Sequence, residues 1–336
     1  GTRAVEAGDL EVEIQVKTRD ELATLAHSFN HMVDGLREKE HIRATFGQYV
    51  DPRIVQRVLE KKLSADGGER QTMSVFFSDL EGFTRLCEGL TPDMAVRFLN
   101  RYFALMSEGV RERQGIVDKY IGDSVMAFWG PPFTDPADHA RLACLAALDQ
   151  MARLDTFRAA LPELFGVTHG LPVVNVRMGL ASGEVTVGNI GSETTRGYTV
   201  IGDTVNLASR LEQANKFYGT RILVSEATRT LAGDSFAFRE IDSLRVVGKL
   251  EPVKVHELLG LTSALNDAAR AAVQAYETGL ARYRAQDWGA AEAAFRECLS
   301  IMPGDRPAQV MLDRIAAFRQ SPPEAEWDGV WVAGSK

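Results

Sequence analysis

The chain contains 336 residues, of which 45% are hydrophobic and 25% are charged, so it can bury more than one core and about two or three domains are expected. Its net charge of −8 argues against a nucleic-acid partner, because binding to phosphates needs a basic face. Its three cysteines are scattered and form no CxxC pair, which favours a reducing compartment and argues against a zinc site.

Residues 1–38 predict a helix that packs against other helices. Its apolar residues follow the alternating spacing of a coiled-coil seam, at Leu22, Leu25, Phe29, Met32 and Leu36. Asp20 can cap this helix at its N-terminus. Together with Ala7-Gly8-Asp9-Leu10, the segment resembles the second half of a HAMP signalling module, so a partial HAMP module is expected here. A lone amphipathic helix that lies on the next domain is the alternative interpretation.

The HAMP resemblance carries expectations about the whole protein. Such a module normally follows a membrane helix, so a membrane anchor and a sensor domain are expected ahead of this chain. The chain itself has no apolar run of the ~18–20 residues that span a bilayer, and we expect it to be soluble. It begins at Gly1 without a methionine, as a trimmed piece of a longer protein would. The expected location is the cytoplasmic side of a bacterial inner membrane.

Residues 39–69 are expected to form a signalling or linker helix. The charged run Arg37–Arg43 interrupts the apolar seam, and apolar character returns at Phe46. Coupling between a sensor and an output domain is one interpretation of this stretch, and a solvated linker helix explains the same charges. His41 raises the possibility of a histidine kinase, but neither a closely following proline nor glycine-rich ATP-binding boxes support it.

Two isolated aspartates stand where chain reversals can bring them together. Asp79 follows a short apolar run, Met73–Phe77, that predicts a buried strand, and Gly82 then allows a tight turn beneath an anionic ligand. Asp123 ends the turn Ile121-Gly122-Asp123 of a predicted hairpin. Magnesium needs only one or two carboxylates and leaves its other positions to water and phosphates, so the pair suits a magnesium site. Two ordinary turn aspartates are the alternative.

A third segment, YTVIGDTVNLASR at Tyr198–Arg210, completes a family pattern. Together with FFSDLEGFT at Phe76–Thr84 and DKYIGDSVMAFWG at Asp118–Gly130, it resembles the class III nucleotidyl cyclase catalytic domain over residues 70–260. The spacing of Asn206 and Arg210 independently places both on one face of a helix. A planar guanidinium is also well suited to hold a phosphate oxygen in a transition state.

The resemblance implies a role for each matching residue. A pair of Mg²⁺ or Mn²⁺ ions is expected to bind Asp79, Leu80 and Asp123. As catalytic residues, Asn206 and Arg210 are expected to position the ribose and stabilise the phosphates. The implied substrate-binding residues are Lys119, Thr199, Phe83, Thr84 and Lys249. Lys249 departs from the pattern, because Val247 occupies the usual lysine position and the two share a face only if no bulge intervenes.

Lys119 and Thr199 occupy the positions that contact the nucleobase in this family, where guanylyl cyclases carry Glu and Cys-like residues. Lysine can only donate hydrogen bonds, which suits the ring nitrogen N1 of adenine, whereas guanine has an N–H at that place. Thr199 can accept from the exocyclic amine, although a hydroxyl also donates. Adenine is therefore favoured, and a solvated hairpin charge is the alternative for Lys119.

The remaining pattern predicts an α+β fold. Residues 91–113 and 136–157 predict amphipathic helices, and glycine-rich Met178–Gly191 predicts a strand that suits a subunit interface, with a surface loop as the alternative. This alternation agrees with the ferredoxin-like sheet and flanking helices of class III cyclases. An N-terminal coiled-coil or HAMP helix and an α-helical C-terminal tail complete the expected architecture.

Residues 261–336 form an Ala-rich helical extension that resembles one tetratricopeptide-type helix pair followed by a further helix, Pro307–Phe318. One repeat cannot stack a solenoid core, so packing on the cyclase domain is favoured over recruitment of a peptide.

The sequence therefore predicts an adenylate cyclase that converts ATP to cyclic AMP and pyrophosphate as a head-to-tail homodimer. A catalytically silent nucleotide-binding module and a guanylate cyclase are the alternatives. A diguanylate cyclase is disfavoured, because Gly67-Gly68-Glu69-Arg70 lacks the ending that its loop requires.

Overall fold

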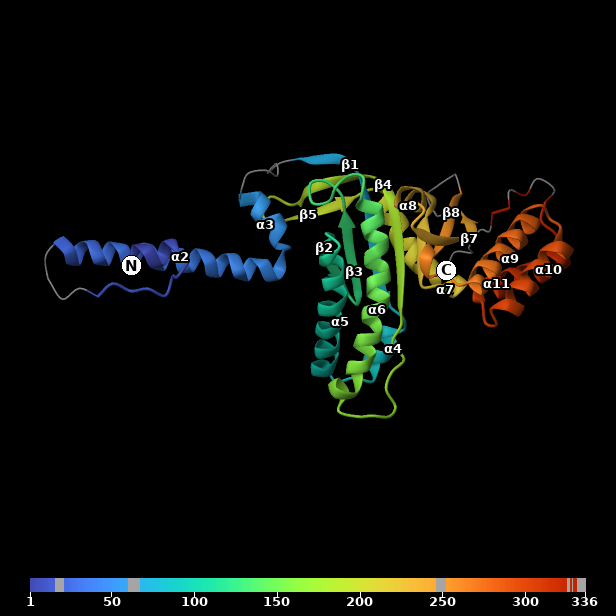
Figure 1. Cartoon of the computed structure of the whole chain (residues 1–336), viewed down its shortest axis with the longest axis horizontal. Helices are drawn as coiled ribbons and strands as arrows, with labels where there is room; N and C mark the ends of the chain where they lie inside the picture. The colour runs from blue at the N-terminus through green and yellow to red at the C-terminus, as the bar shows by residue number, and fades with distance from the viewer. Residues whose placement is uncertain (16–20, 60–66, 246–251, 325–326, 328, 331–336) are drawn as a thin grey trace. The chain divides into compact units, whose positions relative to one another are not determined.

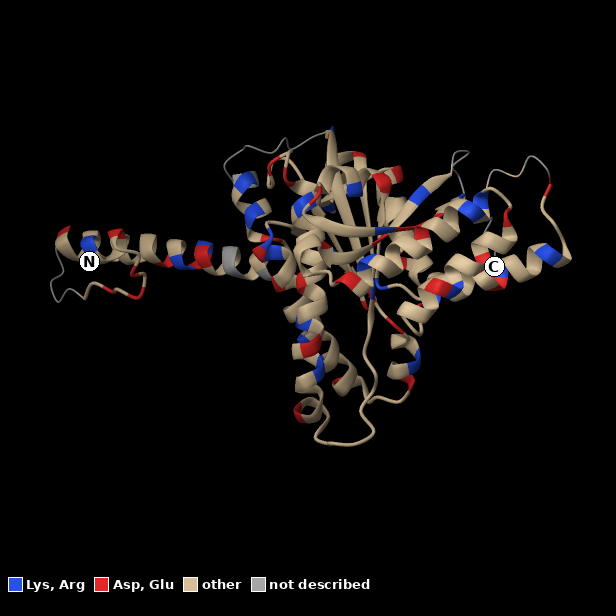
Figure 2. Cartoon of the chain, turned by 45° about the vertical axis from the view of Figure 1, so that its right-hand side comes forward, with Lys and Arg blue, Asp and Glu red and all other residues tan. Residues whose placement is uncertain are grey.

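The computed structural model describes the chain except residues 16–20, 60–66, 246–251, 325–326, 328 and 331–336, and leaves out the side chains of residues 43, 44, 46, 48, 49, 58 and 59. The chain forms two compact units, Gly1–Ala65 and Asp66–Lys336 (Figure 1). None of the described helices combines the length and apolar character needed to cross a membrane. Acidic and basic residues are interspersed along the helices of both units (Figure 2).

The first unit is built on one long helix. It comprises α1 (Thr2–Glu6), α2 (Glu21–Tyr49) and α3 (Pro52–Leu59). The Asn30 side chain of α2 bonds both the N–H and the C=O of Ile14, each at 2.9 Å, which ties the preceding segment to the helix. Within the predicted seam, Leu22 is 61% exposed and Leu25 is 67% exposed, so these side chains are accessible to a further helix. The predicted cap Asp20 lies outside the described residues.

The charged run Arg37–Arg43 does not end α2, which continues through it to Tyr49. Straight-chain Arg, Glu and Lys are good helix formers, so loss of the apolar seam leaves the backbone helical. Helix α2 ends at Tyr49, and the next helix, α3, begins at Pro52.

The second unit is built on a mixed sheet. Its strands are β1 (Gly68–Leu80), β2 (Ile116–Ile121), β3 (Ser124–Trp129), β4 (Val176–Gly191), β5 (Arg196–Ile201), β6 (Ile222–Ser225), β7 (Phe236–Leu244) and β8 (Val253–Leu261). Among the described residues the order is β2-β3-β1-β4-β6-β8-β7, with β5 paired to β4. Among the strands that the structure describes, only the β4–β6 pair is parallel. Met178–Gly191 is thus part of a central strand, and the surface-loop alternative is wrong.

Helices flank this sheet and close its core. They are α4 (Phe83–Glu88), α5 (Pro92–Glu112), α6 (His139–Phe165), α7 (Asp203–Tyr218) and α8 (Glu226–Ala232). Phe98 of α5 and Phe157 of α6 meet edge to face at 5.1 Å, inside a core that also holds Phe76 and Trp129 of the sheet. The predicted α+β class with flanking helices is confirmed. The helix predicted over residues 136–157 is found at His139–Phe165, so it begins and ends later than expected. Buried residues continue along one face of this helix as far as Leu161, and the helix continues through Pro162.

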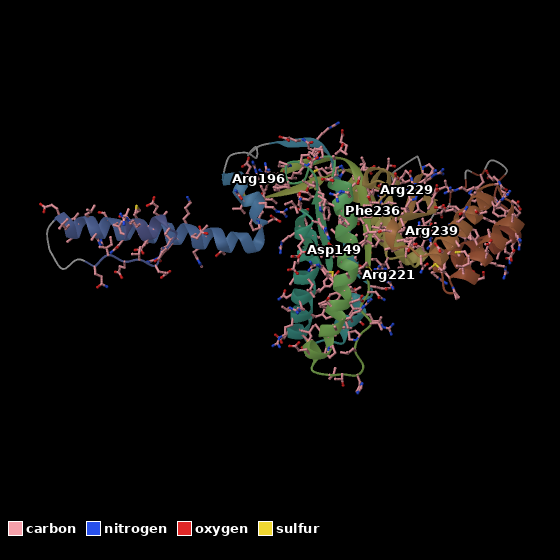
Figure 3. The ribbon with its side chains drawn as sticks, viewed as in Figure 1. Asp149, Arg196, Arg221, Arg229, Phe236 and Arg239 are labelled. Carbon is pink, nitrogen blue, oxygen red and sulfur yellow. The ribbon has the colours of Figure 1, made fainter. Side chains whose placement is uncertain are left out.

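The C-terminal extension forms α9 (Asp267–Arg284), α10 (Trp288–Ile301) and α11 (Arg306–Gln320), and these helices belong to the same compact unit as the sheet. Arg239 of β7 lies where the sheet meets these helices (Figure 3). It pairs with Asp305, at the start of α11, at 2.6 Å. A buried ion pair therefore holds the extension against the sheet, in addition to apolar packing.

Candidate active site

Asp79 and Asp123 lie together, as the sequence predicts. Asp79 is near the end of β1, and the β2–β3 turn brings up Asp123, with Gly122 at φ +63°. The pKa of Asp123 is raised to about 6, first by burial and then by the negative charge of Asp79. Ser124 donates a hydrogen bond to Asp79 at 2.5 Å. Two half-buried carboxylates that repel each other form a site that a cation would stabilise.

The two carboxylates are suitable ligands for a hard cation such as magnesium or manganese. Among the described residues, no three His, Cys, Asp or Glu side chains gather in a way that could hold a metal ion. A site of two carboxylates leaves positions for water, phosphate oxygens and a backbone carbonyl, which hard cations accept. Leu80 has an apolar side chain that is 2% exposed, so only its backbone carbonyl can take part.

Arg177 and Glu212 also belong to this cluster, and the sequence analysis missed both. Arg177 stands directly across from Asp79 on β4 and contacts its carboxylate at 3.1 Å. Its Nε lies 3.4 Å from Glu212 of α7. The pKa of Glu212 is raised to about 7, mainly by burial and then by the charge of Asp79. An arginine within the mostly apolar run Val176–Ala181 is the signal that could have revealed the pair.

Lys119 and Thr199 meet in a second cluster, although they lie far apart in the sequence. Lys119 Nζ donates to Thr199 Oγ1 at 3.3 Å. The hydroxyl of Thr199 in turn donates to Asp118 Oδ2 at 2.7 Å. A register shift between Val117 and Lys119 on β2 marks a bulge at Asp118, whose side chain is only 2% exposed. Burial raises the pKa of Asp118, while Thr199 and Lys119 oppose that shift.

Asn206 and Arg210 lie on the outer face of α7. The helix begins after Gly202, and its opposite face buries Leu207, Ala208 and Leu211. Asn206 is exposed and Arg210 is half-buried. Within the described part of the chain, neither side chain makes a hydrogen bond or ion pair, so both are free to meet a ligand.

Phe83 and Thr84 open helix α4, which follows the left-handed Gly82 at φ +73°. The Phe83 ring stacks on Phe98 at 6.0 Å and packs, partly buried, against the core. Arg221 pairs with Glu81 at 2.6 Å and holds this turn in place. Lys249, together with Val247, lies outside the described residues.

The described structure does not join these clusters into one site. No hydrogen bond or ion pair between described residues connects Lys119 and Thr199 with the Asp79 and Asp123 pair. The same is true of Asn206 and Arg210. A cavity of about 560 Å³ beside the start of α7 is lined by other residues, among them Gly183 and Thr204.

Comparison with known proteins places this chain among nucleotide cyclases. Residues 67–260 match the model of the adenylate and guanylate cyclase catalytic domain, and residues 1–38 match that of the HAMP domain. Adenylate cyclase 1 of Rhizobium meliloti is 34% identical over 247 residues, covering 73% of this chain and 35% of that protein. An adenylate cyclase of Anabaena cylindrica is 33% identical over 265 residues, covering 76% and 51%. The chain thus spans about half or less of these relatives.

Solved structures show the same fold. The adenylyl cyclase CyaB from P. aeruginosa is 34% identical, with a TM-score of 0.53 over 59% of this chain and 99% of that one. The guanylyl cyclase Cya2 is 32% identical, with a TM-score of 0.52 over 60% and 98%. Because the two neighbours are named for different nucleotides, the likeness alone does not select a base.

Proposed function

Because this chain belongs to the adenylate and guanylate cyclase catalytic domain family, we propose that it converts ATP to 3′,5′-cyclic AMP and pyrophosphate. The choice of ATP rests on one observation, the hydrogen bond of 3.3 Å between Lys119 and Thr199. This contact sets a cationic donor directly beside a hydroxyl oxygen. Adenine offers the matching edge, with the acceptor N1 next to the amine at C6, and guanine presents the reverse order.

The other residues supply a pathway for the reaction. The ribose 3′-oxygen bonds to the α-phosphorus in line, the bond from that phosphorus to the pyrophosphate oxygen breaks, and the hydroxyl proton passes to solvent. Asn206 orients the ribose, and Arg210 stabilises the charge that develops on the α-phosphate. Arg177, which contacts Asp79 at 3.1 Å, would add positive charge beside the leaving phosphates. When bound at Asp79 and Asp123, Mg²⁺ or Mn²⁺ would lower the hydroxyl pKa and neutralise phosphate charge.

The direct test is to incubate the purified chain with ATP or GTP, with either Mg²⁺ or Mn²⁺, and to identify the product by mass spectrometry. We expect cyclic AMP from ATP at a clearly higher kcat/KM than cyclic GMP from GTP. Preferential formation of cyclic GMP would make the protein a guanylate cyclase. Absence of both products would favour a silent nucleotide-binding module, although Asp79, Asp123 and Arg210 are all present.

We also propose that the active form is a homodimer with two shared sites. Among the described residues, no hydrogen bond or ion pair joins the carboxylate pair to Lys119 and Thr199 or to Asn206 and Arg210. In the proposed arrangement, a complete site takes the carboxylates of one subunit and the remaining groups of its partner. The exposed seam of α2 would align two copies in parallel, as apolar seams do in coiled coils.

Mixing two inactive variants tests this arrangement. An Asp79→Ala chain paired with an Asn206→Ala chain gathers both lesions into one site and leaves the other site intact. Random pairing should therefore restore roughly a quarter of wild-type activity, by counting sites in a two-fold dimer. As a matched control, Asp79→Ala mixed with Asp123→Ala should recover nothing, because each site then carries a damaged carboxylate pair. No recovery in the first mixture, with heterodimers shown by tagged pull-down, would refute shared sites.

The HAMP match supports a further proposal about the whole protein. This chain would be the output portion of a membrane-linked signalling protein, located in the cytoplasm and controlled by an input domain ahead of it. Activity of a full-length protein in membrane vesicles should then respond to a signal on the input side, whereas the chain alone should have a fixed activity.

A further inference from the structure

We propose that Asp118 is a specificity-determining residue, whose carboxylate accepts a hydrogen bond from the Thr199 hydroxyl and so fixes Thr199 as a hydrogen-bond acceptor for the nucleobase. This inference rests on the proposed function and deepens it. Asp118 is a positioning residue in this scheme, because it acts on the base only through Thr199.

The hydrogen bonds around Thr199 account for its whole donor capacity. A threonine hydroxyl has one proton and two acceptor lone pairs. The proton is directed to Asp118 Oδ2 at 2.7 Å, and an ionised carboxylate can only accept. Lys119 Nζ donates to the same Oγ1 at 3.3 Å and occupies one lone pair. What remains for a ligand is a single acceptor site.

Burial explains why this arrangement is fixed. The Asp118 side chain is 2% exposed, whereas that of Lys119 is 48% exposed. The Asp118 carboxylate is therefore shielded from solvent, whereas the Lys119 ammonium stays accessible and can still donate hydrogen bonds to a ligand. A buried carboxylate must have hydrogen-bond partners, and the partners seen for Asp118 are the Thr199 hydroxyl and, at 3.5 Å, the Lys119 ammonium. If the Thr199 proton turned away, this carboxylate would lose its closest partner.

The fixed proton decides between the two purines. The amine at C6 of adenine can donate to the free lone pair of Thr199. The carbonyl O6 of guanine would instead meet a second acceptor, because the only proton of Thr199 is held by Asp118. A freely rotating hydroxyl could serve either base, so discrimination at this position comes from Asp118 and not from threonine alone.

The test is a double-mutant cycle that measures the ratio of kcat/KM for ATP to that for GTP. This ratio does not depend on how much of a variant is folded. Asp118→Ala should lower it about ten-fold, the effect of a single hydrogen bond on discrimination. In a Thr199→Val background, which has no hydroxyl to orient, the same Asp118→Ala change should leave the ratio unaltered. Equal falls in both backgrounds, or no fall in either, would overturn the inference.

A second variant covers the case in which Asp118→Ala does not fold. Asp118→Asn keeps the shape of the buried side chain, but its amide can face Thr199 with either oxygen or nitrogen. We expect a smaller fall in the ratio, again only when Thr199 is present. An unchanged ratio for Asp118→Asn with the hydroxyl in place counts against the proposal.

Failure of the cyclase proposal can be distinguished from failure of the Asp118 proposal. If the wild-type chain makes no cyclic product, the cyclase proposal fails. Dissociation constants for ATP and GTP, measured by calorimetry with Mg²⁺ on the wild type and Asp118 variants, then test the base preference directly. If the wild type prefers ATP and the Asp118 variants keep that preference, only the role of Asp118 is wrong.

Discussion

Replacing Arg314 with methionine should destabilise the catalytic sheet as well as the C-terminal helices. Arg314 of α11 is 7% exposed and donates to the hydroxyl of Tyr218, the last residue of α7, at 3.1 Å. It also pairs with Asp242 of β7, a carboxylate that is fully buried. Methionine would leave that carboxylate without its cation. Removing one partner of a buried ion pair typically costs about 3–5 kcal/mol, which is a large part of a domain's stability.

Hydrogen exchange followed by mass spectrometry over a urea series can locate this loss. Peptides from α9–α11 and from β1–β4 should lose protection at one shared urea concentration in the wild type, and at one lower concentration in Arg314→Met. The matched control is Arg319→Met on the same helix, which breaks a partly exposed pair with Glu292 and should shift the midpoint far less. If α9–α11 opened early while β1–β4 kept the wild-type midpoint, the buried pair would not couple the two parts.

Three other outcomes are expected. Asp79→Ala and Asp123→Ala should each abolish turnover and leave circular dichroism unchanged, because each removes charge from the candidate cation site; normal cyclic AMP formation by either would contradict the assignment. Lys119→Glu with Thr199→Cys should shift preference from ATP toward GTP, and an unchanged ATP:GTP ratio would show that they do not read the base. Burial lowers the pKa of His139, so folding favours its neutral form. The melting temperature should therefore fall as the pH drops below about 6.5, and His139→Gln should reduce that fall.

Features encoded by neighbouring residues could be predicted from the sequence. The apolar run before Asp79 and the Ile121-Gly122-Asp123 turn each determine local backbone geometry, and so the position of one carboxylate. The helix predicted over residues 91–113 is likewise present as α5, where Pro92 lies in the first turn and Thr91 accepts a hydrogen bond from the N–H of Met94. Such signals need no knowledge of the rest of the fold.

The contacts that shape the site could not be predicted in the same way. Arg177 meets Asp79 only because β4 pairs with β1 in one particular register, and the two residues lie 98 positions apart. Asp118 would face the opposite side from Lys119 in a regular strand, and the bulge at that point removes the simple alternation. The sequence also does not distinguish a buried aspartate from a solvated one. The hydrogen bond that Thr199 donates to Asp118 can therefore be recognised only in the three-dimensional structure.

The C-terminal helices are best understood as a cover for the edge of the catalytic sheet. β7 is the last strand in the sheet order, and an uncovered edge strand exposes backbone groups that can pair with other chains. Helix α9 meets this strand, where the hydroxyl of Tyr276 donates to the carbonyl of Ile241 at 2.9 Å and Glu277 accepts from the N–H of Glu240 at 3.2 Å. A single helix pair has no neighbouring repeat to bury its inner face. The sheet supplies that neighbour, which favours a structural role for α9 and α10 in the catalytic unit.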